Sequence, residues 1–314
     1  VFPNERALQL RQAQLPGVDF LYQLIYSQRG IAKNLLHNSV PSFFIFSPHI
    51  AIVSYFIKGY NGFCGIVRDS SEFLESKIEQ RYLQTEAGEF MDQFTTGGKS
   101  VSVFPAAEPG VPVIYLNADS GEGQQVYEAA LAAGCPLFTL VAIGDLDWNR
   151  DLAPWDSPAA FKGGEQFTGG ADDYLRLLVG DILPRVESSL TDAPAWRGIV
   201  GYSLAGLFAL YAVYHTDVFS RVGSISGSLW FSGWKEYVLT HQPLRRLDCA
   251  YFSLGDKESK TRNPVLMNVR QNTEDICDHY RAMGTDTVFQ LNPGNHFDHP
   301  VERTAAGITW LLSR

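Results

Sequence analysis

From residue 78 onward, short apolar runs alternate with segments of helical periodicity, and no other feature of the sequence constrains the fold as strongly. The apolar runs are rich in Val, Ile, Leu, Phe and Tyr, and most are bounded by Gly, Pro, Asn or Asp, which is typical of strands. Strands that alternate with helices form a mostly parallel sheet covered on both faces, so the predicted class is α/β. We expect strands at 100–105, 111–117, 136–143, 197–202, 221–226, 250–254 and 287–291, and helices at 123–133, 171–190, 205–214, 264–283 and 302–312.

Residues 1–77 lack this alternation, and we expect an N-terminal extension of uncertain structure followed by one α/β domain over residues 78–314. The extension contains a strongly apolar segment, residues 40–57, which reads VPSFFIFSPHIAIVSYFI. A membrane span needs about 20 apolar residues, and the prolines, histidine and serines of this segment raise the cost of insertion. We therefore expect a soluble segment rather than a membrane anchor.

Composition excludes several classes of partner. The net charge of −9 disfavours binding to nucleic acid, because phosphate contacts require a basic surface. The four cysteines are far apart and form no Cys-x-x-Cys motif, so we expect reduced thiols and a cytoplasmic location. No His/Cys/Asp/Glu cluster has metal-ligand spacing and no glycine-rich phosphate loop is present, so neither a metal nor a cofactor is expected. The oligomeric state stays open.

A turn between the predicted strand at 197–202 and the following helix carries the candidate nucleophile, Ser203. A serine nucleophile needs a sharp strand-to-helix bend, which crowds the residues two before and two after it. Here these residues are Gly201 and Ala205, both small, and the departure from the usual second glycine is one methyl group. The amide of Leu204, at the start of the helix, is a candidate oxyanion donor.

The base and the acid are expected after the serine, each in a loop that follows a strand. His296 lies in the loop before the last helix, from which an imidazole can reach the sheet edge, and we prefer it to His299. The loop after the strand at 250–254 offers two carboxylates, of which we prefer Glu258 to Asp256. Asp298 is a weaker third candidate for the acid.

With these motifs the chain resembles the esterase D-like group of α/β-hydrolases, which includes enterochelin (siderophore) esterases, feruloyl esterases, S-formylglutathione hydrolase and mycolyltransferases. Its features are most similar to those of the siderophore-esterase branch. The resemblance covers residues from about 100 to the C-terminus. It rests on VIYLNADSG (113–121), IGDLDWNRDLAPW (143–155), GGADDYLRLLVGDILPRVE (169–187), GYSLAGLFALYA (201–212), SGSLWF (226–231), SLGDKE (253–258) and GNHFDHP (294–300).

The resemblance implies an α/β-hydrolase catalytic domain over residues 78–314, with Ser203, Glu258 and His296 as nucleophile, acid and base. It also implies a second oxyanion donor after the strand at 111–117, at the amide of Ala118 or Asp119. The usual Asp-Gly or His-Gly pair of the group is replaced there by Asn-Ala.

Two further residues, Arg150 and Trp230, are similar to pocket-lining positions of the group. The alternative for each is structural, with Arg150 pinning its loop and Trp230 packing in the core. We expect a serine esterase that forms an acyl-enzyme on Ser203 and acts on a small-molecule ester, either of the siderophore type or a sugar or phenolic ester. The alternatives are acyl transfer to a sugar or alcohol, and a non-catalytic binding module that keeps the fold.

Overall fold

The computed structural model describes residues 40–47, 50–57, 60–63, 67–68 and 92–314. The chain divides into two compact units, Val1–Ser76 and Lys77–Arg314. The boundary that we expect from the sequence, between residues 77 and 78, lies outside the described residues.

The N-terminal unit contains a small antiparallel sheet formed by β1 (Val40–Ser47), β2 (Ile50–Ile57), β3 (Tyr60–Phe63) and β4 (Val67–Arg68). The apolar segment at 40–57 forms β1 and β2, which pair antiparallel with Val40 opposite Phe56. Within the described parts of the chain, no helix has the length and apolar character needed to cross a membrane.

The second unit is built on an eight-stranded sheet, in which six neighbouring strands run parallel. In spatial order the strands are β14 (Asp286–Asn292), β13 (Cys249–Gly255), β12 (Arg221–Ile225), β11 (Arg197–Tyr202), β7 (Val113–Asn117), β8 (Thr139–Gly144), β6 (Lys99–Phe104) and β5 (Asp92–Thr96). At one side of the sheet β6 pairs antiparallel with β8, and β5 pairs antiparallel with β6. Each of the seven predicted strands overlaps a strand of this sheet, in which only the polar edge strand β5 was not predicted, and the short strands β9 (Asp156–Ser157) and β10 (Phe167–Thr168) outside the sheet were not predicted either.

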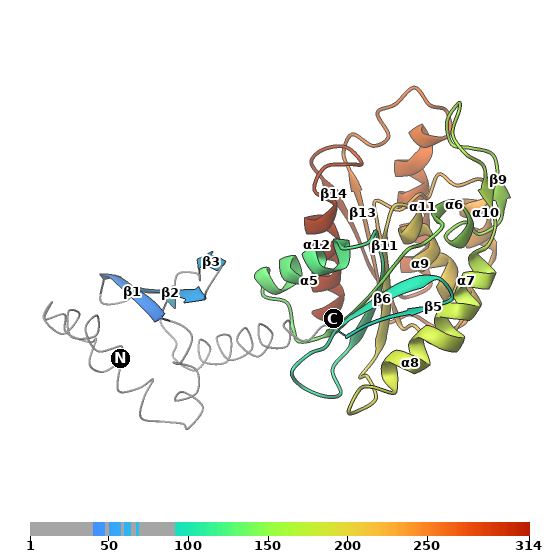
Figure 1. Ribbon diagram of the computed structural model, residues 1–314. Helices are drawn as coiled ribbons and strands as arrows, with labels where there is room; N and C mark the ends of the chain where they lie inside the picture. The colour runs from blue at the N-terminus through green and yellow to red at the C-terminus, as the bar shows by residue number, and fades with distance from the viewer. Residues whose placement is uncertain (1–39, 48–49, 58–59, 64–66, 69–91) are drawn as a thin grey trace, which may run out of the picture. The chain divides into compact units, whose positions relative to one another are not determined.

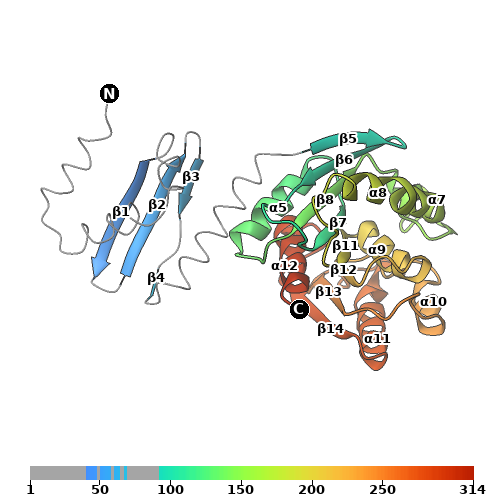
Figure 2. The same cartoon turned by 90° about the horizontal axis from the view of Figure 1, so that it is seen from below.

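Helices cover both faces of this sheet, which confirms the predicted α/β class (Figures 1 and 2). One face packs against α5 (Glu122–Ala132) and α12 (Pro300–Leu312). The other face packs against a larger set, which comprises α7 (Ala171–Leu177), α8 (Leu183–Glu187), α9 (Leu204–His215), α10 (Trp234–Thr240) and α11 (Val269–Ala282). A four-residue helix, α6 (Trp148–Asp151), and a short hairpin of β9 (Asp156–Ser157) and β10 (Phe167–Thr168) lie in the connection between β8 and α7.

The helix expected at 171–190 is interrupted by a π-helical turn, Leu178–Ile182, between α7 and α8. Pro184 explains the interruption, because it has no N–H to donate to the carbonyl of Gly180 and its ring would clash there. Widening the preceding turn by one residue removes this conflict without ending the helix.

Because the strands are parallel, the carboxyl ends of β7, β11, β12, β13 and β14 lie side by side. In α/β proteins the loops that carry function follow these carboxyl ends. α9 starts at the carboxyl end of β11 and is buried at every residue from Leu204 to Tyr214. The start of α9 is therefore held in place by the core.

Candidate active site

Ser203 occupies the sharp turn between β11 and α9. Its φ of 57° and ψ of −123° are unusual for a residue with a side chain, and such strain persists only where the surroundings enforce it. The backbone N–H of Ser203 donates to the carbonyl of Ile225 at 3.0 Å, and its carbonyl accepts from the amides of Leu207 and Ser228. These bonds fix the serine to β12 on one side and to α9 on the other.

The packing around the turn requires small residues. A methyl group on Gly201 would lie 2.3 Å from the carbonyl carbon and oxygen of Ala205. A methyl group on Gly206 would lie 2.8 Å from the carbonyl oxygen of Gly201. The crowding that the sequence predicts at this bend is therefore present, and the methyl of Ala205 is accommodated.

His296 lies in the loop between β14 and α12, with its Nε2 3.0 Å from Oγ of Ser203. Its ring contacts the ring of Tyr202 at a centroid distance of 5.4 Å and is 29% exposed. His299, the alternative base, instead occupies the N-cap position of α12, and its side chain is 75% exposed with Nδ1 3.9 Å from Oε2 of Glu302. The fold thus brings Ser203 and His296, which are 93 residues apart in the sequence, within hydrogen-bonding distance.

Glu258 approaches the other nitrogen of the imidazole, with Oε2 2.7 Å from Nδ1 of His296. Its Oε1 accepts from Oγ of Ser226 at 2.8 Å and from the amide of Gly255 at 2.6 Å. Burial opposes the charge of this carboxylate, yet the hydrogen bond and charge of His296, with those of Gly255 and Ser226, lower the pKa of Glu258 below its ordinary value. Glu258 is therefore ionised at neutral pH, as a partner of an imidazolium should be.

The two other candidate acids hold the loop that carries the histidine. Oδ1 of Asp256 accepts from the amide of Gly294 at 2.7 Å, and this bond lowers the pKa of Asp256. Oδ2 of Asp298 accepts from the amide of Asn295 at 2.7 Å. The structure brings Glu258, and neither aspartate, to the imidazole of His296.

The three amides predicted as oxyanion donors differ in whether they already donate a hydrogen bond within the protein. Leu204 is in the first turn of α9, where amides have no partner within the helix. The amide of Ala118 donates to the carbonyl of Ile143 at 3.0 Å, so it is not free for a substrate. The exposed Asp119 amide donates only to a side chain, that of Glu122 at 3.3 Å, which can move aside. Leu204 and Asp119 therefore remain the candidate pair, and Ala118 does not.

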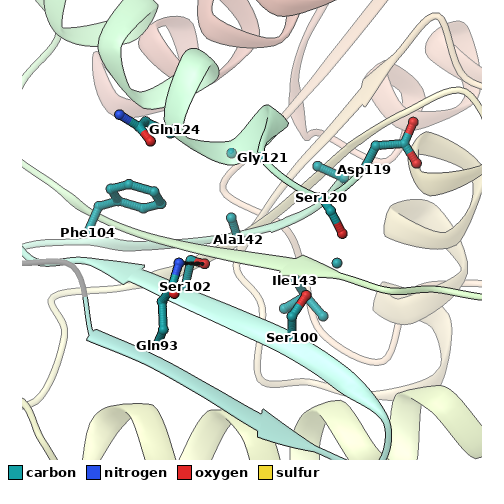
Figure 3. A pocket seen from close by; sticks show the side chains of 13 residues that line it. Gln93, Ser100, Ser102, Phe104, Asp119, Ser120, Gly121, Gln124, Ala142 and Ile143 are labelled. Atoms are coloured by element: carbon teal, nitrogen blue, oxygen red, sulfur yellow. Dashed lines mark hydrogen bonds between the residues drawn. The ribbon is translucent and has the colours of Figure 1, made fainter.

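A cavity of about 90 Å³ adjoins residues 118–121, which follow β7, and lies between β6, β8 and the start of α5 (Figure 3). Polar side chains face it, including those of Ser100, Ser102 and Ser120. Since a water occupies about 30 Å³, the cavity has room for a few waters but not for a multi-ring ester. We assign it no part in substrate binding.

Arg150 and Trp230 both have structural partners. The guanidinium of Arg150 pairs with Asp151 at 3.0 Å and with Asp173 at 2.8 Å, which ties α6 to α7. The half-buried ring of Trp230 packs against Phe167 at 6.0 Å. Because the guanidinium is already paired, pinning its loop is the role that these contacts favour for Arg150.

Three residues near the triad were not predicted from the sequence as part of the site. Arg303 is 5% exposed and donates to several groups of the site, while Phe297 is 85% exposed with its ring edge-on to His296. The Oγ atom of Ser228 lies 3.4 Å from Oγ of Ser203. The signal for Arg303 was a charge on the stripe of α12 that also carries Gly307, Ile308 and Leu311. Across the described residues, no group of three His, Cys, Asp or Glu side chains could hold a metal ion.

Comparison with known proteins gives a family match that lies within this second unit. A family model described as "Putative esterase" matches residues 105–295. The Bacillus subtilis protein described as "Uncharacterized protein YbbA" is 25% identical over 182 residues, which are 56% of this chain and 73% of that protein.

Solved structures match as well. The siderophore hydrolase EstA from Aspergillus nidulans has a TM-score of 0.58 and 18% identity, covering 71% of this chain and 94% of EstA. An IroE-like serine hydrolase from Shewanella oneidensis has a TM-score of 0.59 and 18% identity, covering 71% and 80%. The enterobactin esterase FES from Shigella flexneri has a TM-score of 0.53 and 14% identity, covering 84% and 79%. At such identities these matches show the fold, and they confirm the predicted α/β-hydrolase architecture.

Proposed function

Since the chain belongs to the esterase family and is a carboxylic ester hydrolase, we propose that Ser203, His296 and Glu258 carry out its hydrolysis. The observation that carries this assignment is the continuous hydrogen-bonded chain through the three side chains. Oγ of Ser203 lies 3.0 Å from Nε2 of His296, and Nδ1 of His296 lies 2.7 Å from Oε2 of Glu258. The first distance allows the imidazole to take the hydroxyl proton, and the second allows the carboxylate to orient the imidazole.

The reaction proceeds in two acyl-transfer steps. Nε2 of His296 takes the proton of Ser203 as Oγ bonds to the ester carbonyl carbon, and the carbonyl electrons move to its oxygen. The amides of Leu204 and Asp119 hold this oxyanion. As the tetrahedral intermediate collapses, the C–O bond to the alcohol breaks and the alcohol leaves with the proton from His296. A water then attacks the acyl-enzyme by the same route, releasing the acid and restoring the serine.

The buried Glu258 stabilises the imidazolium that forms in both steps. It remains an anion throughout, because the proton stays on the imidazole. The hydrogen bonds from Ser226 and Gly255 hold its Oε1, while its Oε2 lies 2.7 Å from Nδ1 of His296.

The proposed substrate is an ester of the siderophore type. The solved structures of similar fold include proteins described as a siderophore hydrolase and as an enterobactin esterase, which supports this choice. The exposed ring of Phe297 beside His296 supports it too, because an aromatic acyl group can stack or pack edge-on there. We also propose a cytoplasmic location, in line with the expectation for its cysteines.

A substrate panel with a labelling experiment tests the proposal. The full chain and a Ser203→Ala variant are assayed with a cyclic catecholate triester, a feruloyl ester, S-formylglutathione and short-chain nitrophenyl esters. A fluorophosphonate probe should label the parent on the peptide that contains Ser203 and should not label the variant. The parent should turn over the catecholate triester with the highest kcat/KM.

Each other outcome is informative. Equal turnover by parent and variant would refute the role of Ser203. Labelling with a preference for the feruloyl ester or the thioester would keep the triad and reject the siderophore-type substrate. Transfer of the acyl group to an added alcohol in preference to water would identify an acyltransferase, and a parent without labelling or turnover would identify a binding module.

A further inference from the structure

Arg303 is a buried cation directly behind the candidate triad. It lies near the start of α12, the helix that follows the loop carrying His296, and its side chain is 4% exposed. Burying a charge is costly unless it is paired and hydrogen-bonded, so the partners of this guanidinium must repay that cost. Those partners are all groups that carry or adjoin the triad.

The guanidinium connects three segments of the sheet edge. Its Nη1 donates to the hydroxyl of Tyr202 at 3.3 Å, at the end of β11, and to Oγ of Ser226 at 3.3 Å, after β12. It also donates to the loop after β14, with Nη1 3.1 Å from the carbonyl of Asn295 and Nη2 2.9 Å from that of Pro293. Two of these partners are next to the triad in the sequence, because Tyr202 directly precedes Ser203 and Asn295 directly precedes His296.

Tyr202 closes this arrangement from the other side. Its hydroxyl donates to the carbonyl oxygen of His296 at 2.6 Å while accepting from Arg303. Arg303 and Tyr202, which lie outside the loop between β14 and α12, therefore hold the backbone of that loop at residues 293, 295 and 296. An imidazole held in this way keeps its reach to the serine without depending on the substrate.

The same guanidinium also sets the charge around the acid–base pair. Nη1 of Arg303 lies 3.5 Å from Oε1 of Glu258, and both side chains are at most 5% exposed. Other charged groups near the loop include Asp256, which pairs with Lys260 at 3.5 Å, and Asp298, which accepts from Asn295. Lys257 donates its amide to the carbonyl of Gly294, and the exposed Glu302 lies beside His299. The Asp256–Lys260 pair is partly exposed, so water screens it more than it screens the buried Arg303–Glu258 pair.

We propose that Arg303 is a positioning residue for the ester hydrolysis, which holds the loop of His296 in register with Ser203 and compensates the charge of Glu258. This inference rests on the proposed roles of the triad. Nothing in it requires Arg303 to touch the substrate. Loss of Arg303 should therefore lower kcat and leave KM close to its parent value.

Two substitutions separate the geometric part from the electrostatic part. Arg303→Met keeps much of the side-chain volume but removes both the hydrogen bonds and the charge. Arg303→Lys keeps the charge and removes the fork that spans Tyr202, Ser226 and the loop carbonyls. The matched control is Arg221→Met, because Arg221 is also buried and also donates to α12, at the carbonyl of Leu311, but from the opposite end of β12.

The measurements are kcat and KM against a nitrophenyl ester from pH 5 to 9, the fraction of protein labelled by fluorophosphonate, and the Tm. For Arg303→Met we expect kcat per labelled site to fall about tenfold to a hundredfold. The acid limb of kcat/KM should move to higher pH, because removal of the buried cation makes a positive charge beside Glu258 less unfavourable. Arg303→Lys should keep the limb in place with an intermediate kcat. Arg221→Met should lower the Tm with kcat unchanged.

Several results would overturn the inference. One is an Arg303→Met enzyme whose kcat stays within threefold of the parent and whose acid limb is unmoved. Another is a loss of activity that Arg221→Met reproduces at equal labelling, because this would indicate a structural role only. If Arg303→Met does not fold, an Arg303→Lys variant with parental kcat at every pH refutes the hydrogen-bonding role. Turnover in Ser203→Ala equal to that of the parent is a separate result, which would refute the proposed function.

Discussion

A methyl group at position 201 probes the strand-to-helix bend at the place where the backbone leaves no space. In Gly201→Ala the new carbon would lie 2.3 Å from the carbonyl carbon and oxygen of Ala205, whereas real Cβ contacts are at least 3.0 Å. Backbone must therefore move by at least 0.7 Å, the difference between these distances. The moving segment is the first turn of α9, which contains Leu204 and follows Ser203 directly.

This displacement sets the expected magnitude. A misplacement of about 1 Å in a catalytic group costs on the order of a hundredfold in rate, so we expect kcat/KM to fall about tenfold to a hundredfold in Gly201→Ala. That range corresponds to about 1.4–2.7 kcal/mol of transition-state stabilisation. Overpacking should also cost about 1–3 kcal/mol of unfolding free energy, which lowers the Tm by roughly 2–4 °C per kcal/mol.

Two companion variants isolate the cause. Gly198→Ala adds a methyl to the same strand, but there it meets the flexible end of Ile114 at 2.8 Å, so activity should stay close to that of the parent. The double variant Gly201→Ala with Ala205→Gly should remain impaired, because the closest clash is with the backbone of residue 205 and not with its methyl. The assay is nitrophenyl ester hydrolysis normalised to fluorophosphonate labelling. A Gly201→Ala enzyme as active as Gly198→Ala, or full rescue by the double variant, would refute the reasoning.

Three further predictions concern the acid, the substrate and the thiols. Because the folded pKa of Glu258 is below its ordinary value of 4.5, its ionised form stabilises the fold above that pH and this stability is lost as pH falls through the folded pKa. The unfolding free energy of Glu258→Gln should therefore lie below that of the parent at pH 7 and approach it under acid conditions, and a gap independent of pH in urea titrations would contradict this. Phe297→Ala should raise KM for aromatic acyl esters roughly three- to tenfold while leaving acetyl esters unaffected, and equal KM values in both series would rule out the contact. Burial raises the pKa of the thiols of Cys135, Cys249 and Cys277 to about 12, so in a Cys64→Ser background Ellman's reagent should react only after denaturation, and rapid reaction of the native protein would count against their burial.

The elements that the sequence predicted well are those whose causes are local. The strand Arg197–Tyr202 was predicted with its observed bounds, because an apolar run followed by a crowded small-residue turn has few other conformations. The strand Asp92–Thr96 was missed, since its sequence DQFTT has no apolar alternation and it forms by pairing antiparallel with β6 at the sheet edge. The helices Trp148–Asp151 and Trp234–Thr240 were missed because they are too short to show helical periodicity.

The candidate site was predictable where a motif marks it and unpredictable where a distant contact decides it. Ser203 and His296 follow from their turn and loop contexts, and the structure places them 3.0 Å apart. The resemblance implied the amide of Ala118 or Asp119 as a donor, but the bond from Ala118 to Ile143 depends on the pairing of β7 with β8. Arg303 is 101 residues from one of its partners, Tyr202, and no local pattern encodes that contact.

The choice between Glu258 and Asp256 shows what kind of information was missing. Both carboxylates follow β13 within three residues, and both make hydrogen bonds with the loop that carries His296. Asp256 is the nearer to the strand, so its shorter side chain reaches the backbone of Gly294, while Glu258 turns back to accept from Gly255 and Ser226. Ser226 comes from the end of β12, and its hydroxyl orients one carboxylate oxygen so that the other faces the imidazole. The acid is therefore selected by a residue on a neighbouring strand, and spacing along its own loop could favour Glu258 but could not exclude the aspartate.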